Sequence, residues 1–319
     1  ELGLSKLLSR ESFLQRDAFL QKHSTGAPLN LMSRHLNIPL LKIVSHVLKA
    51  LRQKPEVNVL SCNTQTSWVQ LQERILFPNE RYRDVLEKML KYFKGLTGVF
   101  AIVLIGSLAR GKAVKGSCID LCVFLEKKQF EGLVSSLKAR EKAYSRMGGK
   151  ICYYDGEIEG GIMFDDIRVD IEFTQGKFRL GRMPFEMVND EFETAIGNLF
   201  VYCVPLFQRG NKYQRLRSRF LPFYSDTLRK QRLDGTNKEF QYKIWKTCWL
   251  ADRREYFAAF ETLVEAQKVF LQHLFIKERK YPIDYVKWLK EQYETILDMR
   301  ELYPKLAGVV EGIKLNKRA

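Results

Sequence analysis

The chain has 319 residues, which suits two or three modest domains and is too long for one small core. Hydrophobic residues make up 45% and charged residues 28%, and these ordinary values exclude wholesale disorder. The formal net charge is +16, divided as +5 over residues 1–75, +1 over 76–204 and +10 over 205–319. A basic excess at both ends favours a polyanionic or phosphate-bearing partner, and a merely solvated basic surface is the alternative.

The chain shows no sign of membrane insertion or secretion. No apolar run approaches the roughly 18–20 residues that a membrane span needs. The first residues lack the basic-then-apolar layout of a secretion signal. The six cysteines are scattered, without the spacing of a metal site or a disulfide framework. We therefore expect a cytoplasmic protein with reduced thiols and no membrane partner.

Residues 1–75 predict a winged-helix domain. Apolar residues recur at helical spacing over 41–51, and Pro55 ends this second helix. Two strand-like segments, 57–60 and 66–69, then flank a polar turn and indicate a β-hairpin. In a DNA-binding winged helix the second helix enters the major groove, whereas other members of this fold class dock proteins. The candidate DNA contacts are Lys42, Ser45, Lys49 and Arg52.

The middle part, residues 76–205, predicts an α/β domain with a mixed sheet. A helix is expected over 79–93, and the continuous apolar run 100–105 is typical of a buried strand. Alternating patterns over 117–124 and 168–173 indicate two further strands, and a hairpin-like segment precedes the last of them.

Residues 206–319 predict a helical bundle. Apolar residues at helical spacing indicate one helix over 239–277, and a second is expected over 285–302. We expect Trp245, Trp249 and Trp288 in its core, and His273 packed between helices.

Three short motifs in the middle part carry the chemistry. Gly106 and Ser107 follow a buried strand, where a glycine lets the backbone approach an anion and the next amides can bind phosphate. Because side chains two apart on a strand point the same way, Cys118 and Asp120 share one face, and Asp170 stands on a later strand. Carboxylates beside a phosphate cradle are what metal-assisted nucleotidyl transfer requires.

These motifs resemble the DNA polymerase β nucleotidyltransferase superfamily over the middle part of the chain. Its pattern is a hydrophobic strand, Gly-Ser, about ten residues, an acid-x-acid pair, and a third acid on a later strand. The helical part is similar to the bundles of kanamycin nucleotidyltransferase-like proteins, through Arg279-Lys280-Tyr281-Pro282 and Lys287-Trp288-Leu289. A winged helix ahead of such a domain is similar to predicted archaeal nucleotidyltransferases.

The resemblance implies a nucleoside triphosphate as substrate and Mg²⁺ or Mn²⁺ as cofactor. It assigns nucleotide binding to Gly106, Ser107, Arg110 and Ser117. It assigns metal binding and catalysis to Asp120 and Asp170, with Asp170 also helping to deprotonate the acceptor hydroxyl.

One residue departs from the pattern. Cys118 stands where the family has the first acid of the pair. A thiol is a poor ligand for magnesium, which prefers hard oxygen donors, so catalysis is expected to be weakened. Manganese is softer and would partly restore activity on this hypothesis. Compensation by Glu172 or Asp166 is the other option.

Two functions follow. The first is transfer of a nucleoside monophosphate from a nucleoside triphosphate to a hydroxyl acceptor, which the presence of Asp120 and Asp170 favours. The second is a DNA-binding transcriptional regulator whose degenerate transferase domain senses a nucleotide, which Cys118 favours. These motifs are compatible both with an enzyme and with a regulator that has no enzymatic activity.

Overall fold

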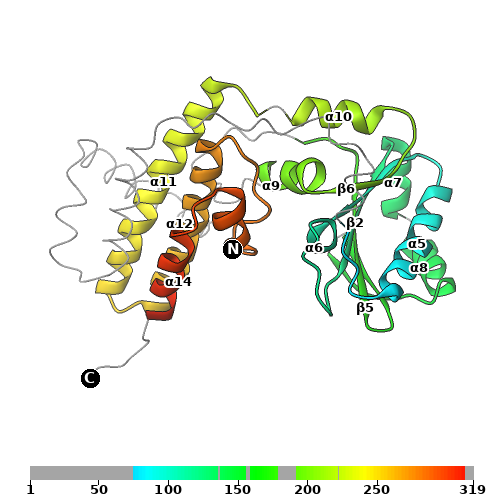
Figure 1. The fold of residues 1–319 in the computed structure, drawn as a ribbon, viewed down its shortest axis with the longest axis horizontal. Coiled ribbons are helices and arrows are strands. Elements are labelled where there is room, and N and C mark those ends of the chain that lie inside the picture. Colours follow the sequence, from blue (N-terminus) through cyan, green and yellow to red (C-terminus); the bar gives the residue numbers. More distant parts are fainter. Residues whose placement is uncertain (1–74, 136, 156–158, 179–191, 222, 313–319) are drawn as a thin grey trace, which may run out of the picture. The chain divides into compact units, whose positions relative to one another are not determined.

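The computed structural model describes most of the chain after residue 74. The described residues are 75–135, 137–155, 159–178, 192–221 and 223–312, drawn as a ribbon in Figure 1. The predicted winged helix, with Lys42, Ser45, Lys49 and Arg52, lies outside them. No helix in the described ranges is long and apolar enough to cross a membrane.

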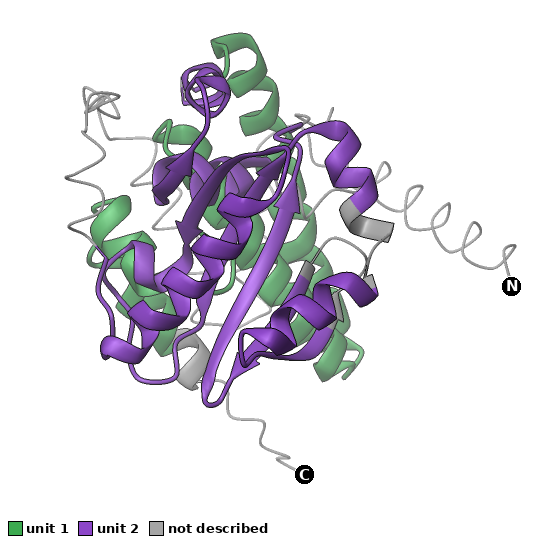
Figure 2. Cartoon of the chain, turned by 90° about the vertical axis from the view of Figure 1, so that its right-hand side faces the viewer, with its two compact units in different colours: residues 1–59, 183–189, 224–319 green, residues 60–182, 190–223 purple. Residues whose placement is uncertain are grey.

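The chain divides into two compact units, coloured separately in Figure 2. The helical unit comprises residues 1–59, 183–189 and 224–319. The α/β unit comprises residues 60–182 and 190–223.

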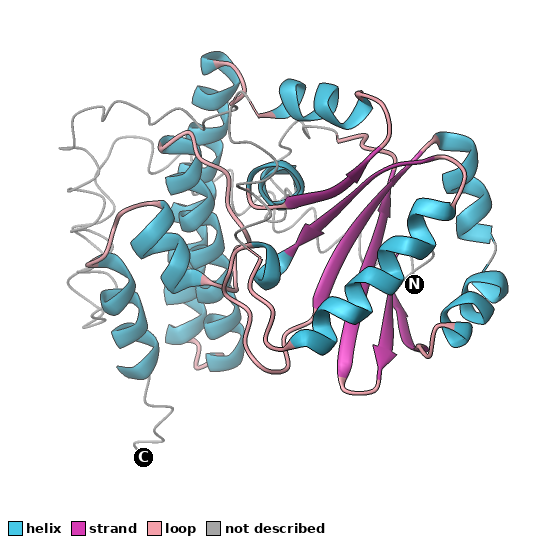
Figure 3. Ribbon diagram, turned by 45° about the vertical axis from the view of Figure 1, so that its right-hand side comes forward, coloured by secondary structure: helices cyan, strands magenta, loops and turns pink. Residues whose placement is uncertain are grey.

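The α/β unit is built on a six-stranded mixed sheet, as predicted (Figure 3). Its strands are β1 (Val99–Ile105), β2 (Ile119–Leu125), β3 (Lys150–Asp155), β4 (Glu159–Phe164), β5 (Ile167–Thr174) and β6 (Val204–Gln208). The order across the sheet is β3-β4-β5-β2-β1-β6. Strands β2 and β5 pair in parallel, and the other neighbours pair antiparallel.

Helices precede, separate and follow these strands along the chain. They are α5 (Glu80–Gly95), α6 (Gly106–Ala109), α7 (Lys127–Ser135), α8 (Leu137–Arg146), α9 (Phe192–Ile196), the π-helix η1 (Gly197–Val201) and α10 (Lys212–Phe220). Helix α5 confirms the helix predicted over 79–93. It buries Val85, Met89 and Phe93, four residues apart, together with Leu86, so one stripe of the helix joins the sheet's core.

Burial along the strands determines where a polar site can form. In β1 every residue except the last is buried, because both faces of this strand are covered. In β5 buried and more exposed residues alternate. Val169 and Ile171 face the core, so Arg168 and Asp170 stand on the opposite, open face of the sheet.

The helical unit confirms the helical C-terminal region but not its predicted boundaries. Its helices are α11 (Asp226–Asp252), α12 (Tyr256–Lys277), α13 (Leu289–Glu291), the π-helix η2 (Gln292–Ile296) and α14 (Leu302–Gly312). The single helix expected over 239–277 is wrong, because a turn separates α11 from α12. The helix expected over 285–302 is also wrong: that segment holds the short α13 and η2, and α14 begins at its last residue.

The turn after α11 explains the first error. The chain ends α11 in a Schellman arrangement, in which the Glu255 N–H donates to the Leu250 carbonyl and the Arg254 N–H donates to the Ala251 carbonyl. Arg254 takes the left-handed conformation, with φ 64°, that glycine usually supplies. Helix α12 ends in the same way at Arg279, with φ 51°. Arginine gives no stop signal in the sequence, so the pattern alone runs through the turn.

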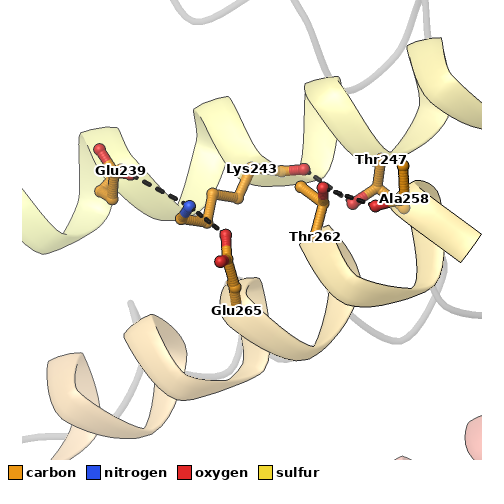
Figure 4. Close-up of polar contacts among 6 residues, drawn as sticks. All are labelled: Glu239, Lys243, Thr247, Ala258, Thr262 and Glu265. Carbon is orange, nitrogen blue, oxygen red and sulfur yellow. Dashed lines mark hydrogen bonds and ion pairs between the residues drawn. The ribbon is translucent and has the colours of Figure 1, made fainter. Parts of the chain in front are cut away.

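A buried lysine links α11 to α12 (Figure 4). Lys243 Nζ lies 2.5 Å from Glu265 Oε2 across the helix pair and 3.6 Å from Glu239 Oε1 on its own helix. Only 9% of the Lys243 side chain is exposed. Because a buried ammonium requires carboxylate partners, this contact fixes the alignment of the two helices along their axes. Thr247 and Thr262 donate their hydroxyls to carbonyls of their own helices.

The tryptophans do not form the core of this unit. Trp249 is 39% exposed and Trp288 is 40% exposed, so the expectation for both is wrong. Trp245 is half-buried and stacks on Trp249, one turn further along α11. Smaller side chains fill the core instead, among them Phe240, Ile244, Val269, Leu271, Leu274 and Phe275.

His273 lies on α12 against α11, as predicted. Its Nδ1 is 2.9 Å from the Thr236 hydroxyl oxygen. Burial, with a smaller effect of the positive charges of Lys277 and Arg229, lowers the pKa of His273 to about 4. The imidazole is therefore neutral at neutral pH.

This neutral histidine makes the helical unit sensitive to acid. The unfolded chain binds a proton at His273 near pH 6.5, whereas the folded chain does so only near pH 4. Its contribution is present above pH 6.5 and is lost as the pH falls to 4, by about 3 kcal/mol in total. We expect urea denaturation to show a steeper loss of stability over this range for the wild type than for His273→Gln. Identical pH dependence of both proteins would contradict this.

Candidate functional site

The site forms where three strands of the α/β unit meet. Parallel pairing of β2 and β5 places Asp120 opposite Asp170. Antiparallel pairing of β1 and β2 places Ile105, the last residue of β1, opposite Asp120 from the other side. Residues Cys118 and Arg168 stand two positions before the two aspartates, and alternation brings them to the same face.

Gly106 is in contact with the Asp120 carboxylate. Its φ is +69°, a left-handed conformation that glycine adopts without strain. A Cβ atom added at Gly106 would lie 2.0 Å from Asp120 Oδ2 and 2.8 Å from Asp120 Cγ. The backbone after β1 therefore does approach an anion, and in this structure that anion is the chain's own carboxylate.

Three side chains lie close enough together to hold a metal ion. The ligand atoms of Cys118, Asp120 and Asp170 all lie within 4.8 Å of one another, and each residue is half-buried. Neither of the acids considered as compensation belongs to this group. Asp166 forms an ion pair with Arg81 at 2.8 Å, and Glu172 lies further along β5, opposite Cys122.

A guanidinium group already contacts two of these three side chains. Arg168 Nε donates a hydrogen bond to Cys118 Sγ at 3.0 Å. Arg168 Nη2 lies 3.1 Å from Asp170 Oδ2. The arginine thus bridges the substituted position and the third carboxylate.

A tyrosine from a more distant strand also reaches Asp170. The Tyr153 hydroxyl on β3 donates to Asp170 Oδ1 at 2.8 Å, although β4 lies between β3 and β5. It passes over Gly161 of β4, where an added Cβ would lie 2.1 Å from the Tyr153 ring. Gly161 therefore gives the ring its path to the carboxylate.

The electrostatics of the site keep the Cys118 thiol and the Tyr153 hydroxyl protonated. Burial raises the pKa of Cys118, and the charges of Asp170 and Asp120 raise it further, while Arg168 opposes this. Burial and the hydrogen bond to Asp170 raise the pKa of Tyr153 to about 12. At neutral pH the site therefore presents a thiol and a phenol beside two carboxylates.

The remaining predicted residues surround this group. Gly106 and Ser107 begin α6, and Ser107 is buried. Arg110 follows α6 and is half-buried. The Ser117 hydroxyl accepts a hydrogen bond from the Val114 amide at 2.9 Å, within the loop that leads to Cys118.

Sequence reasoning missed Tyr153, Gly161 and Arg168. A signal existed for the arginine, because Arg168 precedes Asp170 by the same two positions that separate Cys118 from Asp120. Two adjacent glycines inside a strand were a signal for a close approach at β4. Neither signal states which side chain makes the contact.

Comparison with known proteins finds that part of the chain is similar to a nucleotidyltransferase domain. Residues 86–160 match the family model described as a nucleotidyltransferase domain, and they include Gly106, Cys118 and Asp120. A solved structure of a nucleotidyltransferase-like protein from Exiguobacterium sibiricum 255-15 is 12% identical with a TM-score of 0.32. That similarity covers 72% of this chain and 73% of the other. No curated protein matches the chain in sequence.

The contact between Gly106 and Asp120 gives a direct prediction. Gly106→Ala would place a methyl group against the Asp120 carboxylate and would force a left-handed alanine, which alone costs roughly 1–2 kcal/mol. We expect chemical denaturation to show a loss of at least about 1 kcal/mol.

Gly132→Ala is the matched control. Gly132 lies in α7, and nothing stands within 4 Å of an added Cβ there. Alanine should stabilise that helix by roughly 0.5–1 kcal/mol. Equal effects of the two substitutions would contradict the described contact.

Proposed function

We propose that the α/β unit binds a nucleoside triphosphate and transfers its nucleoside monophosphate to a hydroxyl acceptor. The observation that carries this proposal is the pairing of Asp120 with Asp170 across parallel strands, directly beside the Gly106 turn. Its context supports it, since the matched nucleotidyltransferase domain contains both Gly106 and Asp120. The proposed phosphate-binding residues are Gly106, Ser107, Arg110 and Ser117.

The proposed reaction is a single displacement at the α-phosphorus. The acceptor hydroxyl oxygen forms a bond to the α-phosphorus while the bond to the bridging oxygen breaks, and pyrophosphate leaves. The proton of the acceptor hydroxyl passes to the Asp170 carboxylate, which acts as general base. Contacts from Tyr153 and Arg168 hold Asp170 in one orientation for this role.

The residues present do not fit the magnesium ion that the superfamily pattern implies. One of the three ligand atoms is a protonated thiol sulfur, whereas magnesium prefers oxygen ligands in octahedral geometry. Arg168 already contacts two of the three side chains. The reaction proposed above therefore has no step that passes through a metal ion.

A second candidate function is favoured by the Cys118–Arg168 contact. With a thiol in place of the first acid, the unit would bind a triphosphate without turning it over. The chain would then act as a nucleotide-responsive regulator, with DNA bound through Lys42, Ser45, Lys49 and Arg52. Salt-sensitive DNA binding that depends on these residues would support this candidate.

Triphosphate binding is the first test. Titration calorimetry with ATP, GTP, CTP and UTP should show binding of at least one of them to the wild type. Each titration is done with EDTA, with magnesium and with manganese. Asp120→Ala should weaken binding, because the Asp120 carboxylate packs against Gly106 and supports the turn that is proposed to hold the phosphates. Asp84→Ala, an exposed aspartate on α5, is the matched control and should bind normally. If no triphosphate binds under any of these conditions, the proposal fails.

Pyrophosphate release then separates the two candidates. The acceptors to be tried are a nucleoside, an amino sugar and an oligoribonucleotide with a free 3′-hydroxyl. Release that depends on an acceptor, and is lost in Asp170→Asn, is expected for the transferase. Tight triphosphate binding without release with any acceptor would favour the regulator.

A further inference from the structure

The α/β unit contains a cationic side chain at the centre of its acidic site. Arg168 extends from β5, two residues before Asp170, and lies across the pair of strands from Cys118. Its Nε and Nη2 atoms are 3.0 Å from Cys118 Sγ and 3.1 Å from Asp170 Oδ2, respectively. These atoms belong to two of the three side chains that could hold a metal ion.

Arg168 reduces the net negative charge of the site. Asp120 and Asp170 contribute two negative charges and Arg168 contributes one positive charge, whereas the Cys118 thiol is neutral. A guanidinium stays protonated over the whole pH range in which proteins are folded, so the positive charge of Arg168 is permanent. A divalent ion entering the site would meet one net negative charge and the repulsion of an adjacent guanidinium.

The guanidinium is also able to contact a ligand. A guanidinium has five N–H donors, and these two contacts leave others. The Arg168 side chain is 47% exposed, while that of Asp170 is only 22% exposed. A planar fork of donors on the open face of the sheet is suited to phosphate oxygens.

Neighbouring residues hold the arginine in this position. The Tyr153 ring lies 6.0 Å from the Arg168 guanidinium carbon, and the same tyrosine donates to Asp170. A carboxylate at position 118 would pair with the arginine more strongly and would also attract a metal ion. The thiol pairs with the arginine less strongly than a carboxylate would and does not attract a metal ion. Cys118 therefore suits a site whose cation is Arg168.

We propose that Arg168 is the resident cation of this site, taking the place of a divalent metal ion, and that it binds the triphosphate directly. The second half of this inference rests on the function proposed above. It predicts a site that binds polyphosphate without metal and binds free divalent ions poorly.

The polyphosphate test uses the full chain and inorganic tripolyphosphate in EDTA. Calorimetry should show binding to the wild type, with an affinity unchanged by added magnesium. Arg168→Met should weaken binding about 10- to 100-fold, the range expected for loss of a hydrogen bond to a charged group. Arg146→Met, an exposed arginine on α8, is the matched control and should bind normally. Circular dichroism melting would verify that each variant is folded.

The metal test needs no nucleotide and uses manganese alone. Electron paramagnetic resonance should show weak Mn²⁺ binding by the wild type. The double variant Cys118→Asp with Arg168→Met should bind Mn²⁺ at least about tenfold more tightly, because it has three carboxylates and no cation. Cys118→Asp alone should fall between them, since Arg168 still competes with the ion.

The two tests can fail separately. Wild-type Mn²⁺ binding as tight as that of the double variant would overturn the assignment of Arg168 as the resident cation, whatever the polyphosphate result. Tripolyphosphate binding that EDTA abolishes and magnesium restores would also overturn it, while leaving the proposed nucleotide site standing. If neither tripolyphosphate nor any nucleoside triphosphate binds, the proposed function fails, and the manganese series still decides the role of Arg168.

Discussion

The site depends on the parallel pairing of β2 with β5, in a sheet whose other described pairs are antiparallel. This register sets Asp120 opposite Asp170 and brings Arg168 to Cys118. A shift of β5 by one residue would turn Asp170 and Arg168 to the buried face. The core-facing residues of β5, such as Val169 and Ile171, resist that shift because it would expose them to water. Hydrophobic burial on one face of the sheet thus specifies the geometry of the polar groups on the other.

Strand alternation made much of this arrangement predictable. The pattern of period two indicated both strands and their faces, and a resemblance suggested which acids would meet. Contacts that cross strands were not predictable in the same way. The path of Tyr153 over Gly161 requires the β3–β4 register, and the bond from Arg168 to Cys118 requires the β2–β5 register. Local patterns carry neither register.

The helical unit shows a different limit of prediction from sequence, which concerns where helices end. Helical periodicity indicates that a segment is helical, but a helix end is recognised by its glycine or proline. Here α11 ends next to Arg254, an arginine in the left-handed conformation, so no sequence signal marked its end, whereas the end of α12 was correctly predicted at residue 277. The exposed Trp249 illustrates a related point: size and hydrophobicity favour burial on average, yet the core of α11 and α12 is filled by smaller side chains.

The wide spacing of the paired strands along the chain also bears on how the protein folds. Cys118 and Arg168 are 50 residues apart, and α7, α8, β3 and β4 lie between the two strands that carry them. Closing such a loop is entropically unfavourable until the contacts it brings are made. The hairpins β3–β4 and β4–β5 involve neighbouring segments and can form early, whereas the β2–β5 pair must wait for the crossover to be in place. The charged groups of the site are therefore expected to come together late in folding, when β2 and β5 join the two halves of the sheet.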